Sequence, residues 1–129
     1  MSVAHCYPKG KNIPKEERFD LKHVLYAARV GAEVGVDIVK TYYTGSAETF
    51  ARVVECVPVK VVAAGGPKID DVKQLFSTVK DIVDSGSAGI TYGRNIWQDS
   101  NVKGIISALK AIVHENASPD EAYEMYMNG

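Results

Sequence analysis

The chain alternates four times between a short run of small and β-branched residues and a longer segment whose apolar residues recur at helical spacing. The four short runs are SVAHCY, VDIVKTY, VKVVAA and AGITY. Strands that alternate with helices pair in parallel through right-handed crossovers. The order therefore predicts an α/β fold built on one parallel sheet.

Helices are predicted where apolar residues recur every three or four positions, over residues 19–34, 50–57, 72–83 and 102–113. A short C-terminal helix through Tyr126 is predicted after Ser118. The sequence Ser-Pro-Asp-Glu there combines a capping residue, a proline at the first helical position and an acid at the third. The four short runs are apolar on both faces, which is typical of parallel strands that are covered on both sides.

Four β-α units without a linker or low-complexity segment indicate a single domain over residues 1–129. A small open sheet is one way to arrange them. A closed (β/α)8 barrel needs eight units and about 250 residues. This chain of 129 residues has half of that, so a small open sheet and a (β/α)4 half of such a barrel, either with a short C-terminal helix, both stay open at this point.

Charge and composition exclude several classes of function. Fifteen basic and 16 acidic residues leave a net charge of -1, which offers no electrostatic basis for binding nucleic acid or an anionic membrane. No apolar run approaches the roughly 20 residues that span a bilayer. The start, MSVAHCYPKG, lacks the pattern of a signal peptide, so we expect a cytoplasmic protein with free thiols at Cys6 and Cys56. Neither the cysteines nor the histidines have ligand spacing, and no metal site is expected.

Residues with possible chemical roles follow the predicted strands, and the carboxyl ends of parallel strands are where α/β folds place their sites. Lys40 stands near the end of the second run. Burial or a neighbouring cation lowers the pKa of a lysine, which frees its amine to attack a carbonyl and form a Schiff base. A lysine that only extends its ammonium into solvent is the more ordinary interpretation. The spacing of the residues alone does not decide between a nucleophilic Lys40 and a solvent-exposed one.

Two glycine turns follow the third and fourth runs. Gly65-Gly66 and Gly93 each separate a strand from a helix, where backbone N–H groups suit a phosphate. Arg94 would add a charge-assisted contact. The alternative is that glycine only permits a tight turn and that Arg94 is a surface residue.

The first run contributes a phenol and an imidazole. Tyr7 is a candidate proton donor or acceptor near the amine, or a packing residue. His5 lies two residues earlier, so it points to the same side and is a candidate to line the pocket. Tyr42, at the end of the second run, and Lys68, at the end of the third, are further candidates for the pocket lining.

Five stretches resemble, in order, the archaeal-type class I fructose-bisphosphate aldolases, also called the DhnA type, within the DeoC/LacD superfamily. They are YPKG, GVDIVKTYYTG, VVAAGGPK, GITYGRNIWQ and IVHENASPDEAYEMY, and they span nearly the whole chain. The resemblance implies the C-terminal half of a TIM barrel, strands five to eight, and Schiff-base aldol chemistry without a metal or organic cofactor. Relatives on the same scaffold make 2-amino-3,7-dideoxy-D-threo-hept-6-ulosonate or act as thiolases on phosphorylated autoinducer-2.

The resemblance also implies a role for individual residues. Lys40 matches the lysine that forms the Schiff base, and Tyr7 matches the acid/base tyrosine. The two turns match the loops that bind the substrate phosphate, which assigns that role to Gly65, Gly66, Gly93 and Arg94. The implied substrate is a phosphorylated sugar such as fructose 1,6-bisphosphate.

The chain departs from the family pattern in its length and in one acid. Family chains are about twice as long, and their first half carries an aspartate in a motif like DHG. No such motif occurs here, and neither Asp37 nor Asp70 has that context. One aldolase pattern has a tryptophan at the position of His5, so the identity of the substrate stays undecided.

A half-barrel has open edges, and we expect a partner: a second copy or a complementing N-terminal half. The alternative to an enzyme is a catalytically inactive half-barrel that only binds phosphate or assembles with a partner.

Overall fold

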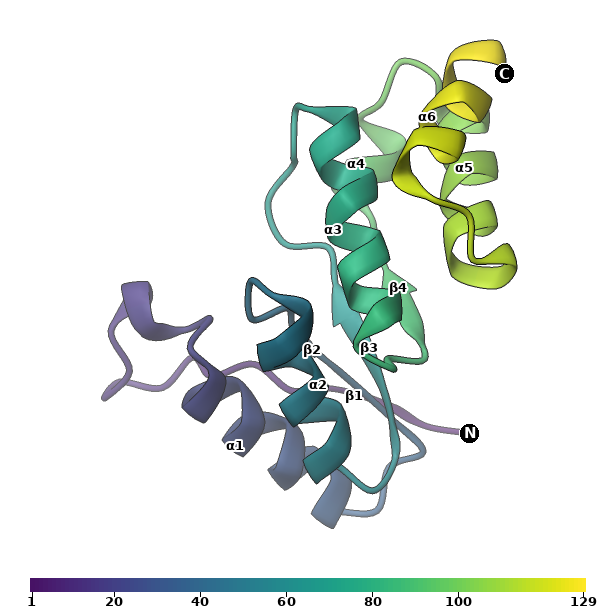
Figure 1. The fold of residues 1–129 in the computed structure, drawn as a ribbon. Helices are drawn as coiled ribbons and strands as arrows, with labels where there is room; N and C mark the ends of the chain where they lie inside the picture. The colour runs from purple at the N-terminus through teal and green to yellow at the C-terminus, as the bar shows by residue number, and fades with distance from the viewer.

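A computed structural model describes all of residues 1–129 and contains the four expected β-α units (Figure 1). The strands are β1 (Val3–His5), β2 (Ile38–Tyr42), β3 (Lys60–Ala64) and β4 (Gly89–Thr91). The predicted helices are α1 (Leu21–Glu33), α2 (Ala47–Cys56), α3 (Val72–Asp84), α5 (Val102–Glu115) and α6 (Pro119–Asn128). Apolar spacing did not predict two short elements, the 3-10 turn η1 (Lys15–Glu17) and helix α4 (Arg94–Trp97).

The four strands form one parallel sheet in the order β1-β2-β3-β4, which confirms the predicted α/β architecture. Their register places His5 beside Lys40, Lys40 beside Val62, and Val62 beside Gly89. Every strand runs in the same direction, so all four carboxyl ends reach the same edge of the sheet. Lys40 and the glycine turns are brought together there.

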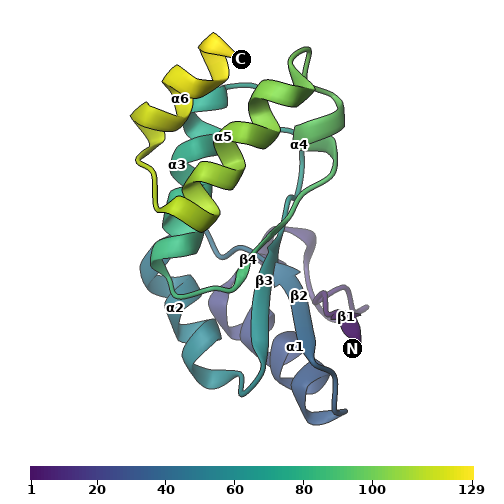
Figure 2. The same ribbon diagram turned by 90° about the vertical axis from the view of Figure 1, so that its right-hand side faces the viewer.

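The helices pack on one face of the sheet only (Figures 1 and 2). On that face the strand side chains are fully buried, and they are Val39, Thr41, Val61 and Ala63. On the other face Ile38, Lys40, Tyr42 and Val62 are only half-buried, and Val3, His5 and Lys60 are exposed. The apolar residues of the open face have no cover within this chain.

The apolar core divides into two clusters. One lies between α1, α2 and the sheet, around Phe50 and Val53. The other lies between α3, α5 and α6, around Phe76 and Ile112. Ala122 of α6 is fully buried in the second cluster, so the C-terminal helix is part of the core (Figure 1).

None of the helices combines the length and the apolar character that crossing a membrane requires. Both cysteines are free thiols, as expected: Cys6 is half-buried and Cys56 is exposed.

The predicted cap of α6 forms a reciprocal capping box. The Ser118 hydroxyl accepts from the Glu121 amide at 3.2 Å, and the Glu121 carboxylate accepts from the Ser118 amide at 2.7 Å. These hydrogen bonds lower the pKa of Glu121. We expect Ser118→Ala to reduce the free energy of unfolding by about 1 kcal/mol, measured by urea titration. Ser107→Ala, an exposed change inside α5, is the control, and an equal loss there would contradict the capping role.

A tyrosine outside the site makes the stability depend on pH. Tyr43 donates to Asp81 at 3.5 Å, and burial, with the charge of Asp81, raises the pKa of Tyr43 to about 12. A tyrosine in the unfolded chain ionises near pH 10. The contribution of Tyr43 to the free energy of unfolding is therefore fully present below pH 10 and is lost as the pH rises toward 12. We expect Tyr43→Phe to flatten the fall of the urea midpoint between pH 9.5 and 11.5. Tyr26→Phe, at a position 75% exposed, should leave the slope unchanged.

Candidate active site

A hollow of about 370 Å³ lies at the carboxyl ends of the four strands. Its lining includes seven residues predicted from the sequence: Tyr7, Lys40, Tyr42, Gly65, Gly66, Gly93 and Arg94. Lys9, Ala64, Thr91 and Trp97 complete it. The parallel sheet therefore gathers residues that are as much as 90 positions apart in the chain, from Tyr7 to Trp97.

The strand pair β1-β2 positions Lys40 and Tyr7. The Cys6 amide donates to the Lys40 carbonyl at 2.8 Å, and the Thr41 hydroxyl donates to the Cys6 carbonyl at 2.8 Å. These bonds hold the chain beyond β1 against β2. Because side chains alternate along a strand, buried Thr41 faces the helices and half-buried Lys40 faces the open side.

Aromatic packing orients Tyr7. Its ring stacks on Tyr42 with centroids 4.5 Å apart and an interplanar angle of 22°, and Phe19 packs on Tyr42 at 4.7 Å. Burial raises the pKa of Tyr7, and the neighbouring Tyr42 and Cys6 raise it further. The Tyr7 phenol is therefore protonated at neutral pH and available as a proton donor.

Sequence reasoning missed Lys9 as a residue of this hollow. The Lys9 amide donates to the Tyr7 carbonyl at 2.9 Å, across a tight turn at Pro8. The Lys9 ammonium then lies 5.3 Å from the centroid of the Tyr7 ring and 5.9 Å from that of Tyr42. The sequence feature that could have indicated this role of Lys9 is its place in the YPKG motif, two residues after Tyr7. Lys9, Lys40 and Arg94 line the hollow without any carboxylate, an arrangement that favours an anionic ligand.

The two glycine turns supply backbone donors beside these cations. The N–H groups of Gly65, Gly66 and Gly93 donate to no protein acceptor. Gly66 has a φ of 61°, a conformation that disfavours side chains. A Cβ on Gly93 would lie 2.4 Å from the ring of exposed Trp97, so a larger residue there would displace that ring. The Arg94 guanidinium donates to the Gly66 carbonyl at 2.8 Å and links the turns.

Asn95 fixes the position of the first turn from the second. It is 2% exposed, and its amide nitrogen donates to the carbonyls of Gly65 at 3.0 Å and Pro67 at 3.2 Å. Its amide oxygen accepts from the Ile69 N–H at 2.7 Å. Sequence reasoning missed this role, although Asn95 directly follows Arg94.

Two candidates for the pocket lining lie elsewhere. His5 lines a separate hollow beside β1. Lys68 donates to the Gln98 carbonyl at 3.2 Å and lines a neighbouring depression. Of the two aspartates considered for acid/base chemistry, Asp37 accepts hydrogen bonds from Ser2 at the amino end of β2, and exposed Asp70 lies 3.9 Å from Lys68. Neither aspartate lines the hollow.

Comparison with known proteins places these features in one family. Residues 1–99 match the DeoC/LacD family of aldolases. A fructose-bisphosphate aldolase class 1 of Halobacterium salinarum is 37% identical over 121 residues, which are 93% of this chain and 45% of that protein. A 2-amino-3,7-dideoxy-D-threo-hept-6-ulosonate synthase of the same species is 34% identical over 120 residues, 93% of this chain and 44% of that protein.

Solved structures agree with the sequence matches. An archaeal fructose 1,6-bisphosphate aldolase superposes with a TM-score of 0.83 at 32% identity, over 88% of this chain and 44% of that one. A fructose-bisphosphate aldolase from Slackia heliotrinireducens superposes with a TM-score of 0.87 at 26% identity, over 98% of this chain and 42% of that one. These matches confirm the predicted half of an aldolase barrel, consistent with its C-terminal half.

The chain thus spans less than half the length of the curated relatives it matches. The family match covers residues 1–99, which include every residue that lines the hollow. By sequence and by fold, the chain belongs to the DeoC/LacD family of aldolases.

Proposed function

We propose that this chain carries the Schiff-base centre of a class I aldolase that acts on a phosphorylated ketose such as fructose 1,6-bisphosphate. The observation that supports it most is the composition of the hollow. A lysine on the open sheet face shares that hollow with a protonated tyrosine, two further cations and unpaired backbone N–H groups, and no carboxylate lines it. A phosphorylated carbonyl compound matches both the nucleophile and the positive charge.

In the proposed reaction the neutral amine of Lys40 attacks the ketone carbon, and loss of water leaves a protonated imine. The imine accepts the electron pair of the breaking C–C bond, which forms an enamine and releases an aldehyde. Tyr7 moves the protons: its phenol donates first, in keeping with its raised pKa. The reverse sequence forms the C–C bond.

The phosphate is assigned to the glycine turns. The N–H groups of Gly65, Gly66 and Gly93, which have no protein acceptor, would donate to its oxygens, and Arg94 and Lys9 would supply positive charge. Binding there would hold the carbon chain over Lys40 and convert the attack into an intramolecular step. No metal or organic cofactor takes part in this proposal.

Reductive trapping tests the proposal directly. The purified chain is incubated with dihydroxyacetone phosphate or fructose 1,6-bisphosphate, treated with sodium borohydride and analysed by peptide mass spectrometry. We expect a reduced adduct on Lys40 alone among the lysines. Binding of inorganic phosphate without any adduct would overturn the enzymatic proposal.

The second candidate function is a half-barrel that binds phosphate or assembles with a partner but does not turn over. Two observations favour it: the open face leaves Lys40 half-buried, and no aspartate lines the hollow. Imine trapping without release of an aldehyde would support this candidate, since it would show a nucleophile that lacks the rest of the acid/base machinery.

Substrate choice within the family calls for a separate assay. The matched relatives include a fructose-bisphosphate aldolase and an ulosonate synthase, and thiolysis of phosphorylated autoinducer-2 uses the same kind of lysine. Cleavage of fructose 1,6-bisphosphate, measured beside the other two reactions at equal protein concentration, distinguishes the three.

A further inference from the structure

The last helix of the chain is tied to the loop that follows the second glycine turn. After Gly93 comes the short helix α4, and residues 98–101 then lead into α5. The Tyr126 hydroxyl of α6 donates to the Asp99 carboxylate at 3.0 Å, and the Asn101 side chain donates to the Tyr126 carbonyl at 3.0 Å. Two hydrogen bonds therefore join α6 to the loop behind α4.

Asp99 connects these bonds to α4 and to the turn. Its carboxylate also accepts from the Asn101 amide at 2.7 Å, and its own amide donates to the Ile96 carbonyl at 3.1 Å. The Ile96 amide in turn donates to the Gly93 carbonyl at 2.8 Å. A continuous path of hydrogen bonds therefore runs from Tyr126 to Gly93, through one carboxylate and one short helix.

Packing holds Tyr126 in place at the start of this path. Its ring meets Phe76 of α3 edge-on with the centroids 6.0 Å apart, and Ala122, one turn earlier in α6, is fully buried in the second cluster. Burial and the hydrogen bond to Asp99 raise the pKa of Tyr126, so its phenol stays protonated and donates at neutral pH. The hydroxyl is therefore presented to Asp99 from the packed core.

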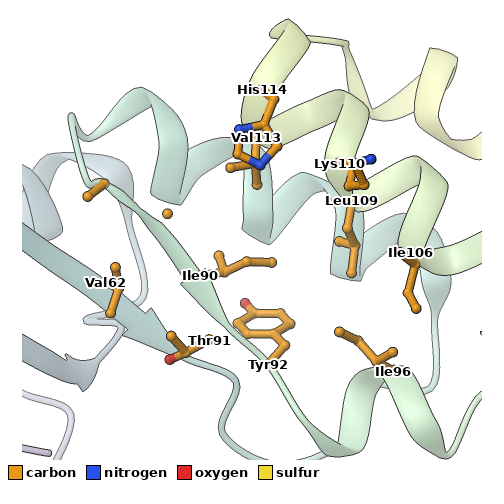
Figure 3. A pocket seen from close by; sticks show the side chains of 12 residues that line it. Val62, Ile90, Thr91, Tyr92, Ile96, Ile106, Leu109, Lys110, Val113 and His114 are labelled. Atoms are coloured by element: carbon orange, nitrogen blue, oxygen red, sulfur yellow. The ribbon is translucent and has the colours of Figure 1, made fainter. Parts of the chain in front are cut away.

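Helix α4 has little packing of its own. Only Ile96 of its apolar side chains joins the second cluster, at the rim of the apolar hollow between β4 and α5 (Figure 3). Arg94 and Asn95 bind the start of the helix to the first glycine turn. Its other end is held by the bonds of Asp99 and by exposed Lys68, which donates to the backbone there. Polar contacts therefore decide where α4 lies.

We propose that Tyr126 is a positioning residue of the second glycine turn: through Asp99 it fixes α4, so that the Gly93 amide and Arg94 keep their places in the hollow. The inference rests on the proposed function for the assignment of a phosphate to this turn. Helix α6 lies beyond residues 1–99, to which the family match is confined. A turn that is in place for only part of the time binds its ligand more weakly in proportion.

Trp97 reports the position of α4 without any ligand, because it is the only tryptophan of the chain and lies in that helix. The purified chain is labelled with 5-fluorotryptophan, and its single fluorine resonance is recorded. We expect Tyr126→Phe to shift and broaden this resonance, since the ring keeps its contact with Phe76 but loses the bond to Asp99. Tyr123→Phe on the same helix is the matched control. Tyr123 makes its contact to Lys73 through the ring, so its change should leave the resonance as it is.

Isothermal calorimetry with inorganic phosphate measures the consequence for binding. We expect the dissociation constant to rise about fivefold in Tyr126→Phe and about tenfold in Asp99→Ala, which also loses the bond to the Asn101 amide. Loss of a carboxylate by itself favours a bound anion, so weaker binding by Asp99→Ala reports a lost position and not a lost charge. Circular dichroism checks that each variant folds.

Asp99→Asn separates the hydrogen bonds from the charge, because it keeps an acceptor oxygen for the Tyr126 hydroxyl and the Asn101 amide. We expect its dissociation constant to stay within about twofold of that of the unchanged chain. Binding as weak as that of Asp99→Ala would contradict the path of hydrogen bonds.

A double substitution shows whether Tyr126 acts through Asp99. In the Asp99→Ala background, Tyr126→Phe should change neither the fluorine resonance nor the dissociation constant any further. A full additional effect there would overturn the proposal, and so would an unchanged Trp97 resonance in the single variant Tyr126→Phe. If the unchanged chain binds no phosphate, the proposed function loses its phosphate site, and the fluorine resonance still decides whether α6 positions α4.

Discussion

Replacing Lys40 by methionine should abolish borohydride trapping and lower any aldol cleavage by at least about 1,000-fold. Methionine is similar in length and apolar, so it can occupy the half-buried position beside His5 and Val62 without a new charge. The reaction loses its nucleophile, and no other amine follows the same path to the substrate carbonyl. Peptide mass spectrometry after reduction, together with a coupled assay for triose phosphate release, measures both effects.

Lys60→Met is the matched control for this substitution. Lys60 pairs with Ile38 at the amino end of β3, two residues before Val62, so it lies on the same open face as Lys40 but away from the hollow. We expect its adduct yield to equal that of the unchanged chain. Equal trapping in Lys40→Met, with the adduct on Lys9, would move the nucleophile to the other lysine of the hollow.

Much of the fold follows from local patterns. Parallel strands joined by helices were predicted because β-branched runs and helical spacing alternate, and the α6 cap because Ser118 and Glu121 have the spacing of a capping box. The same patterns do not tell what covers the open sheet face. Runs such as VDIVKTY are apolar on both faces, but their periodicity cannot say whether helices of the same chain cover the second face or a separate body does.

The candidate site was predictable where chemistry and position coincide along the chain. Lys40 lies in β2 near its carboxyl end, and the glycine turns directly follow β3 and β4, so the topology alone brings them together. Lys9 and Trp97 reach the hollow through a turn at Pro8 and through the short helix α4, neither of which has a periodic signal. Asn95 acts through three hydrogen bonds to a loop some 26 to 30 residues earlier in the chain, and such contacts leave no mark in local sequence.

Asn95→Ala should have the largest effect of any substitution that removes no reacting group. The change removes three hydrogen bonds that buried Asn95 makes to the carbonyls of Gly65 and Pro67 and to the amide of Ile69. Because each such hydrogen bond contributes about 0.5–1.5 kcal/mol, we expect a loss of about 2–4 kcal/mol in the free energy of unfolding. The first glycine turn would also lose its anchor, and affinity for inorganic phosphate should fall about tenfold.

Urea titration and isothermal calorimetry with inorganic phosphate measure the two effects of Asn95→Ala. Gln98→Ala is the control at the end of the same helix, since its side chain is exposed and only its carbonyl accepts from Lys68. Asn95→Asp separates the bonds: it retains an acceptor for Ile69 but loses both donors to the turn. We expect it to bind phosphate as weakly as the alanine variant does, because the donors hold the turn. Phosphate binding that survives both substitutions would show that the glycine turn holds its conformation without Asn95.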